Sequence, residues 1–89
     1  MNEVKNISTY YKEYVANLES SLRIRGRELD YVIRTSTANP IAISIAGLAF
    51  DNKKLTQANI EWVLTSFLRD PIDKPVLEKL AYLVWKDTI

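Results

Sequence analysis

Arginines are the residues of this 89-residue chain whose type and spacing could do chemistry. Arg23, Arg25 and Arg27 follow one another closely, and Arg34 lies further along the chain. Guanidinium groups bind phosphates and carboxylates through paired hydrogen bonds. At helical spacing Arg23, Arg27 and Arg34 share one exposed face, where they could contact phosphates or the carboxylates of a partner protein. Because acidic residues such as Glu19 lie among them, we favour a solvated, charge-paired face.

Arg25 differs from the other three, because helical spacing places it on the apolar side of the segment, next to Gly26. A charge on that side is costly unless it is paired or reaches water. Three interpretations follow. Arg25 pairs with an acidic residue of a neighbouring helix or subunit, or it contacts an anionic ligand, or the helix breaks at Gly26 and Arg25 faces solvent. The sequence leaves all three open.

Aromatic side chains are the second sign of a contact surface. Trp62 points away from the apolar side of its own segment, and Tyr10 and Tyr31 flank the apolar side of the first segment. Tryptophan and tyrosine are common anchors of protein interfaces. Burial beneath another helix is the favoured alternative, since tryptophan is highly buried on average. These three aromatics and the four arginines are the predicted partner-binding residues, whereas Trp85 is predicted to be structural.

The composition excludes most catalytic and metal-binding arrangements. The chain has no cysteine and no histidine, so it can form neither a disulfide nor a Ser/His or Cys/His pair, and zinc sites are not expected. Its 2 glycines cannot build a phosphate-cradling loop. We therefore expect a protein that is not an enzyme and has no cofactor or metal. A net charge of +1 argues against nucleic-acid binding through bulk charge.

Helices must position these residues, because apolar residues recur at helical spacing. One long amphipathic helix is predicted from about Ser8 to Thr35, roughly 40 Å in length. Its apolar stripe consists of Ile7, Tyr11, Tyr14, Val15, Leu18, Leu22, Leu29, Val32 and Ile33. The stripe keeps its phase across Gly26, which favours a continuous helix over a break at Arg25–Gly26. Gly26 would then weaken the helix by about 1 kcal/mol relative to alanine.

A turn and a strongly apolar helix are predicted next. Residues 35–40 are typical of a turn, in which Asn39 caps the following helix and Pro40 takes its first position. That helix runs from Ile41 to about Phe50 and is apolar nearly all round, so it belongs in the centre of the fold.

Two more helices complete the prediction. Thr56 is expected to cap a helix over residues 57–69, and Asp73 to cap the last one. The fold class is therefore all-α, a small helical bundle of four helices, or five if the first one breaks. All of them belong to a single domain over residues 1–89.

The apolar spacing of the C-terminal third resembles that of short helical regulators of enterobacteria, the biofilm regulator YmgB and its relatives. The positions that carry the resemblance are Leu55-Thr56-Gln57-Ala58-Asn59-Ile60, followed by Leu64, Leu68, Asp73, Leu77, Leu80 and Val84. Any pair of packed helices shares such spacing. The resemblance therefore implies a small regulatory binding protein and assigns no family.

A protein–protein interaction module is the expected function, as an adaptor, inhibitor or regulator that occupies a partner's surface. A chain this short buries only about 60–65% of its surface on folding, so homo-oligomerisation is expected. The long helix would provide the dimer seam or the docking face. A nucleic-acid-associated regulator using Arg23, Arg27 and Arg34 is one less favoured alternative. A binder of a small anion, such as a nucleotide, at a subunit interface is the other.

A cytoplasmic location is expected, because the first residues lack the apolar stretch of a signal peptide. The longest nearly apolar run, residues 41–50, is about half the length needed to span a bilayer.

Overall fold

The computed structural model of the chain describes residues 2–52 and 55–88, with side chains described for residues 9–50 and 55–88. Its elements are the helices α1 (Asn2–Glu28), α2 (Thr35–Gly47), α3 (Gln57–Phe67) and α4 (Lys74–Thr88), and a π-helical turn, η1 (Leu48–Asn52). No strand occurs in the described ranges. The predicted all-α class with four packed helices is confirmed.

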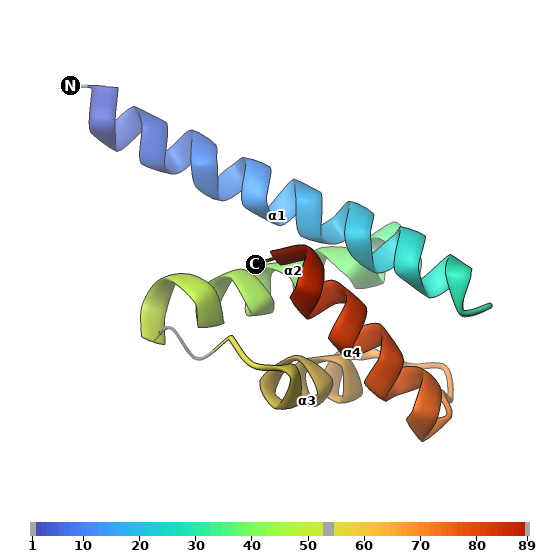
Figure 1. Cartoon of the computed structure of the whole chain (residues 1–89). Helices are drawn as coiled ribbons and strands as arrows, with labels where there is room; N and C mark the ends of the chain where they lie inside the picture. Colours follow the sequence, from blue (N-terminus) through green and yellow to red (C-terminus); the bar gives the residue numbers. More distant parts are fainter. Residues whose placement is uncertain (1, 53–54, 89) are drawn as a thin grey trace.

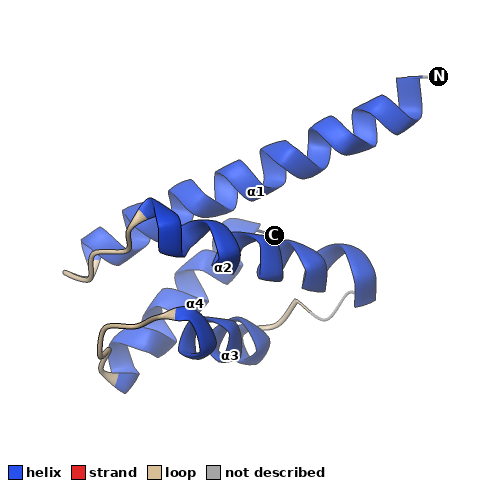
Figure 2. Cartoon of the chain, turned by 180° about the vertical axis from the view of Figure 1, so that it is seen from behind, coloured by secondary structure: helices blue, strands red, loops and turns tan. Residues whose placement is uncertain are grey.

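The helices are arranged around α2 and α4, which lie between α1 on one side and α3 on the other (Figures 1 and 2). α2 runs back along α1, and the start of α1 projects beyond the other helices (Figure 1). The molecule therefore measures 47 × 23 × 19 Å. None of the described helices has the length and hydrophobicity that crossing a membrane requires.

Every α-helix contributes apolar side chains to one core. The buried residues are Leu18, Leu22, Ile33, Ala38, Ile41, Ala42, Ile45, Ala46, Ile60, Val63, Leu64, Leu80, Ala81 and Val84. α2 is central as predicted, although Ile43 is exposed. The described part of the α1 stripe packs on α2 and α4, whereas Ile7 lies outside the described side chains. Apart from Val32, which is 75% exposed, little of the stripe from Tyr11 onward is thus left to dock a partner.

α1 has different bounds from those predicted. It is already helical at Asn2, and it ends at Glu28 with Asp30 at a φ of 60°. The amide of Tyr31 donates to the carbonyl of Gly26 over 2.8 Å, and the amide of Asp30 donates to the carbonyl of Arg27 over 3.0 Å. These two bonds form the Schellman motif that ends many helices. Aspartate is one of the few residues besides glycine that adopt this left-handed conformation.

The chain turns back over α1 at Gly26, through which the helix runs without a break. A Cβ atom on Gly26 would lie 2.6 Å from the carbonyl oxygen of Tyr31 and 3.2 Å from Cδ1 of Ile33. The first distance is far below van der Waals contact. The missing side chain therefore allows Ile33 to be buried against α1. Gly26 is therefore a packing site, and its predicted cost to the helix stays a prediction.

α2 begins earlier than predicted. Thr35, the predicted end of the first helix, is its first residue, so residues 35–40 are helical and do not form a turn. Pro40 stands in the second turn, where it cannot donate to the carbonyl of Ser36. Arg34 occupies the cap position that was predicted for Asn39, and it makes no side-chain cap hydrogen bond. The α2 N-terminus is therefore left without a side-chain cap.

α3 and α4 follow the prediction more closely. Thr56 caps α3, because its Oγ1 accepts a hydrogen bond from the amide of Asn59 over 3.1 Å. α3 ends at Phe67, slightly before the predicted end, and α4 begins directly after Asp73. Trp85 is structural as predicted, since its ring packs against the core and its Nε1 donates to the carbonyl of Leu55 over 3.2 Å.

Candidate functional site

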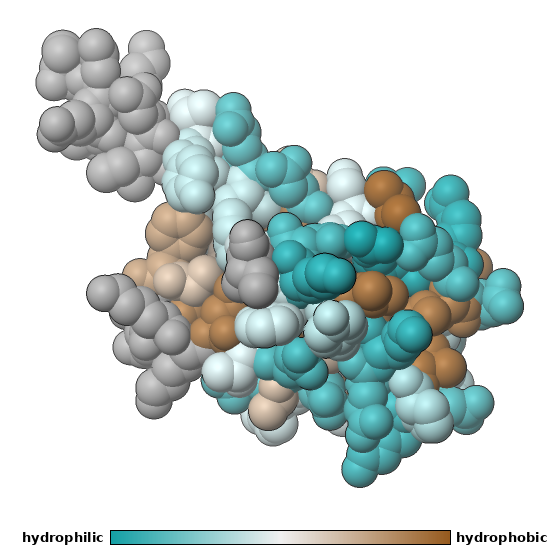
Figure 3. Space-filling model, in the orientation of Figure 1, coloured by the Kyte–Doolittle hydropathy of each residue, from teal (hydrophilic) through white to brown (hydrophobic). Residues whose placement is uncertain are grey.

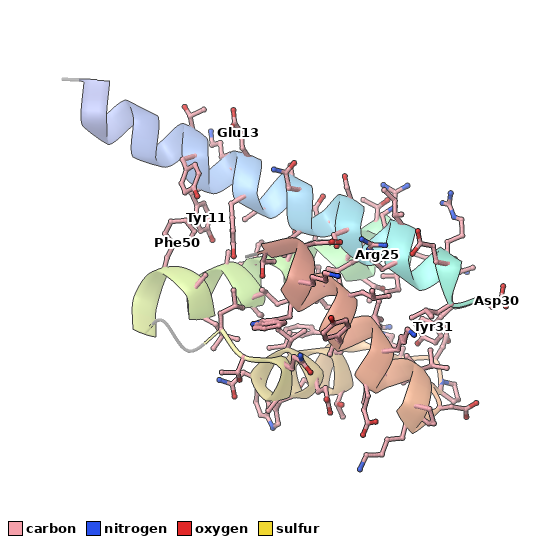
Figure 4. The ribbon with its side chains drawn as sticks, in the orientation of Figure 1. Tyr11, Glu13, Arg25, Asp30, Tyr31 and Phe50 are labelled. Carbon is pink, nitrogen blue, oxygen red and sulfur yellow. The ribbon has the colours of Figure 1, made fainter. Side chains whose placement is uncertain are left out.

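Arg25 ties α1 to the end of α4. Its Nε and Nη2 atoms donate to the two carboxylate oxygens of Asp87, both over 2.9 Å, and Nη1 donates to Glu28 over 3.0 Å. Ser21 donates to the same carboxylate over 2.6 Å. Figure 4 shows Arg25 directed toward α4. Of the three open interpretations, pairing with an acidic residue of a neighbouring helix is the one that the structure contains.

The same contacts shift the protonation equilibria of both partners. Hydrogen bonds from Arg25 hold the pKa of Asp87 below its usual value, although burial acts in the opposite direction. Hydrogen bonding to Asp87 raises the pKa of Arg25. All three donor-bearing nitrogens of Arg25 are occupied within the chain, so this residue is a clasp between helices.

Tyr10 belongs to an aromatic cluster around Phe50, at the place where α1 passes over η1. The ring centroids of Tyr10, Tyr11 and Tyr14 lie 6.0, 5.6 and 5.3 Å from that of Phe50. Tyr11 and Phe50 point toward each other in Figure 4, whereas Glu13 points away from the cluster. Burial, followed by the neighbouring Tyr10, raises the pKa of Tyr14. Tyr10 therefore takes part in intramolecular packing while remaining 59% exposed.

The predicted shared face of Arg23, Arg27 and Arg34 is wrong. The first two lie one turn apart on the exposed side of α1, but Arg34 lies outside that helix, at the cap of α2. Glu19 does not pair with them, because its carboxylate accepts a hydrogen bond from the amide group of Asn39 in α2. Among the described side chains, these three arginines make no ion pair.

The connection between α1 and α2 presents two side chains outward. Residues 31–34 are not helical, and Arg34 has extended backbone angles, with φ −75° and ψ 154°. Ile33 faces the core and is buried, whereas Val32 is 75% exposed and Arg34 is exposed. Val32 was predicted to lie on the apolar stripe of a longer helix. The early end of α1 instead places an aliphatic side chain in solvent beside an arginine.

A groove of about 600 Å³ lies between this segment and the end of α3. We call it the arginine groove, and its lining residues are Tyr31, Val32, Ile33, Arg34, Ser36, Thr37, Pro40, Ser66, Phe67, Leu68, Arg69 and Asp70. Its lining residues come from the α1–α2 connection, the start of α2, the end of α3 and the α3–α4 connection. The two connections lie at the same end of the molecule, on the left of Figure 2. Segments far apart in the sequence therefore form its two walls.

A hydrogen bond joins the two walls, since the hydroxyl of Tyr31 donates to the carbonyl of Asp70 over 2.8 Å. Burial, followed by the charge of Asp70, raises the pKa of Tyr31. Arg34 and Arg69 are exposed and make no ion pair within the described part of the chain. Apolar groups and free guanidiniums in one groove suit an aromatic ring or a carboxylate of a partner.

Trp62 stands on the outer side of α3, one turn before Ser66 of the groove. The buried residues of α3 are Ile60, Val63 and Leu64, and Trp62 lies on the opposite side at 72% exposure. The favoured prediction, burial beneath another helix, is therefore wrong for this residue. In contrast, hydrophilic residues cover most of the face that α1 and α4 form (Figure 3).

Of the predicted contact residues, the structure brings Tyr31 and Arg34 together in one groove and places Trp62 close to it. Arg23, Arg25, Arg27 and Tyr10 do not line it. Val32, Phe67 and Arg69 are among the groove residues that the sequence prediction missed. Val32 could be recognised only from an end of α1 at Asp30, which no glycine marks. In the described part of the chain, no cluster of acidic residues is arranged to hold a metal ion.

No family model, no curated protein and no solved structure matches the chain.

Proposed function

We propose that the chain is a protein–protein interaction module that binds its partner through Trp62 and the arginine groove. The observation that carries the proposal is the 72% exposure of Trp62, next to a groove that contains Val32, Phe67 and two arginines. Tryptophan and arginine are the side chains most enriched among residues that dominate binding energy. Burial of a large aromatic ring is energetically favourable, and a partner that covers Trp62 would gain this free energy.

The proposed surface differs from the docking face that the sequence predicted. The described stripe of α1 is used inside the molecule, where Leu18 and Leu22 are buried. Nucleic-acid binding loses its geometric basis, because Arg34 does not extend the face of Arg23 and Arg27. A small anion would have Arg34 and Arg69 as partners, but the apolar residues of the groove favour a protein.

Comparative capture with matched variants tests the proposal. The baits are the tagged wild-type chain, Trp62→Ser and Ile24→Ser, each in a lysate of the source cells that still contains the untagged chain. Ile24 is an exposed apolar residue of α1 that does not line the groove, so its variant controls for a general loss of surface hydrophobicity. The free energy of unfolding of each variant is expected to lie within about 0.5 kcal/mol of the wild-type value, because both sites are exposed.

Proteins held by the wild type and by Ile24→Ser, but lost with Trp62→Ser, are the expected result. Labelling of the Trp62 ring by an oxidant should also fall when the lysate is present. If the three baits retain the same proteins to the same extent, the surface is not a docking site and the proposal is overturned.

A further inference from the structure

We infer that the partner at this surface is a second copy of the chain, and that Trp62 of each copy enters the arginine groove of the other. This inference rests on the proposed function and names the occupant of the surface. Trp62 and the arginine groove lie close together at α3. A protruding aromatic ring and a groove that suits such a ring stand about one helical turn apart, which is about 6 Å along α3.

A twofold symmetric contact needs both complementary parts on the same patch of one copy. The α3 face meets this condition, since Trp62 is the protruding part and the groove is the receiving part. Two α3 helices that pack antiparallel bring each Trp62 to the groove end of the other helix. A parallel pairing would instead place the two Trp62 rings against each other and leave both grooves empty.

Charge complementarity supports the antiparallel pairing. Arg34 and Arg69 can each place a guanidinium over the face of an indole ring, a contact that strengthens when water is excluded. Arg34 and Arg69 share the groove lining with one acidic residue, Asp70, so the groove keeps one excess positive charge. In the antiparallel pairing, each copy therefore presents its Trp62 ring to the two arginines of the other.

The surface between Trp62 and the groove is suited to a close helix contact. Thr65 Oγ1 donates to the carbonyl of Glu61 over 2.9 Å, and Ser66 Oγ donates to the carbonyl of Trp62 over 2.9 Å. Both hydroxyl protons are thus already used within α3. These two side chains are small and leave no donor unpaired when a second helix covers them.

The exposed area of the chain also fits a dimer. A monomer of 10.2 kDa is expected to expose about 5,300 Å², whereas this chain exposes 6110 Å². The difference is about 800 Å² summed over the whole chain, which is similar in size to the area that one partner buries in an interface of standard size. The projecting start of α1 adds to the exposed area, as do the apolar side chains around the groove.

Sedimentation velocity on the full chain, from about 10 µM to 1 mM, tests the inference. The wild type should pass from monomer to dimer within this range. Trp62→Ser and the double variant Arg34→Glu/Arg69→Glu should each weaken dimerisation by about 30-fold or more. Ile24→Ser should dimerise like the wild type. Far-ultraviolet circular dichroism and thermal unfolding confirm that each variant is folded.

Mixing the two weakened variants supplies the sharpest measurement. In a mixed dimer, Trp62 of the double variant meets the intact groove of Trp62→Ser, so one of the two symmetric contacts is restored. The mixture should therefore contain more dimer than either variant alone at the same total concentration. A contact in which Trp62 and the groove do not meet gives no such gain.

Three results would overturn the inference: a monomeric wild type up to 1 mM, a Trp62→Ser variant that dimerises as tightly as the wild type, or a mixture without gain. The first of these leaves the proposed function intact if the captured proteins still depend on Trp62. If the captured proteins do not depend on Trp62 and dimerisation does not depend on it either, both the proposed function and the dimer inference are overturned.

Discussion

The two ends of α1 meet the rest of the molecule in different ways. Toward its C-terminus, the missing side chain of Gly26, the left-handed Asp30 and the paired hydrogen bonds of Arg25 each restrict which residue types fit. Toward its N-terminus, Tyr10 and its neighbours contact Phe50 through rings that remain partly exposed. Position-specific geometry thus determines one end, whereas adaptable apolar contact holds the other.

This difference has a consequence for sequence tolerance. A ring contact survives many apolar substitutions, because its energy follows buried area and needs only approximate geometry. A backbone that approaches a helix within 2.6 Å of where a Cβ would stand accepts only glycine. Conservative changes should therefore be costly at the C-terminal end of α1 and mild at the N-terminal end.

The largest effect is expected for Gly26→Ala. Alanine favours the helix by about 1 kcal/mol over glycine, but its methyl group would collide with the Tyr31 carbonyl and press on Ile33. Overpacking costs about 1–3 kcal/mol, and a clash with backbone belongs in the upper part of this range, so a net loss of about 1–2 kcal/mol is expected in urea unfolding. Ser20→Ala, at an exposed position of the same helix, is the control and should be neutral or slightly stabilising. A Gly26→Ala variant as stable as that control would show that packing does not require glycine at this end of α1.

Phe50→Ala examines the other end. Three ring contacts are lost, but Phe50 is itself exposed, so the free energy of unfolding should fall by only about 1 kcal/mol. Amide hydrogen exchange should speed up in the first turns of α1 and stay unchanged near Gly26. A loss larger than that of Gly26→Ala would show that the aromatic end is the more tightly determined one.

Asp30→Gly should stabilise the protein. Glycine adopts a φ of 60° without steric cost, and the change removes a negative charge from the negative end of the helix dipole. The greater freedom of glycine in the unfolded chain offsets part of this gain, which leaves about 0.5 kcal/mol. Asp30→Ala should destabilise, because alanine gains nothing in the left-handed region. If both variants shift the unfolding midpoint equally, backbone conformation does not control this helix end.

Asp87→Asn should have the smallest effect, a fall in Tm of about 1–2 °C at neutral pH, since the contact with Arg25 is partly exposed. Because the pKa of Asp87 is lowered in the folded state, its contribution is complete above the unfolded value, near 3.8. It is lost as the pH falls through the lower folded value. The Tm difference between wild type and variant should therefore stay constant from about pH 5 to 8 and close below about pH 4. A difference that persists in stronger acid would mean that the charge of Asp87 is not its cause.

Much of the fold could be predicted from the sequence, because helical periodicity reports which residues face a core. Periodicity identified four helices and the central position of α2, and the residue type of Thr56 indicated its capping role. The end of α1 escaped prediction for a physical reason. Ile33 is buried in the core from a non-helical connection, although a longer helix would also place it on the core side. Periodicity alone cannot separate these two arrangements.

The candidate site was less accessible to prediction. Trp62 could be placed on the outer side of its helix from spacing alone, but its exposure depends on which element packs nearby. The arginine groove depends on how the α1–α2 and α3–α4 connections meet, and no local pattern encodes that meeting. Arg25 was predictable in part. Its spacing showed that its charge needs a partner, but only the folded structure identifies that partner as Asp87.

The contrasting environments of the two tryptophans make the molecule its own optical reporter. Trp85 is partly buried and hydrogen-bonded, so its fluorescence follows unfolding, whereas Trp62 emits from solvent. When a partner covers α3, the emission of Trp62 should shift to shorter wavelength, while that of Trp85 stays unchanged. A soluble quencher separates the two signals, because it reaches the exposed Trp62 first, and no attached label is needed. Tryptophan fluorescence of one sample can thus distinguish unfolding of the chain from binding of a partner at α3.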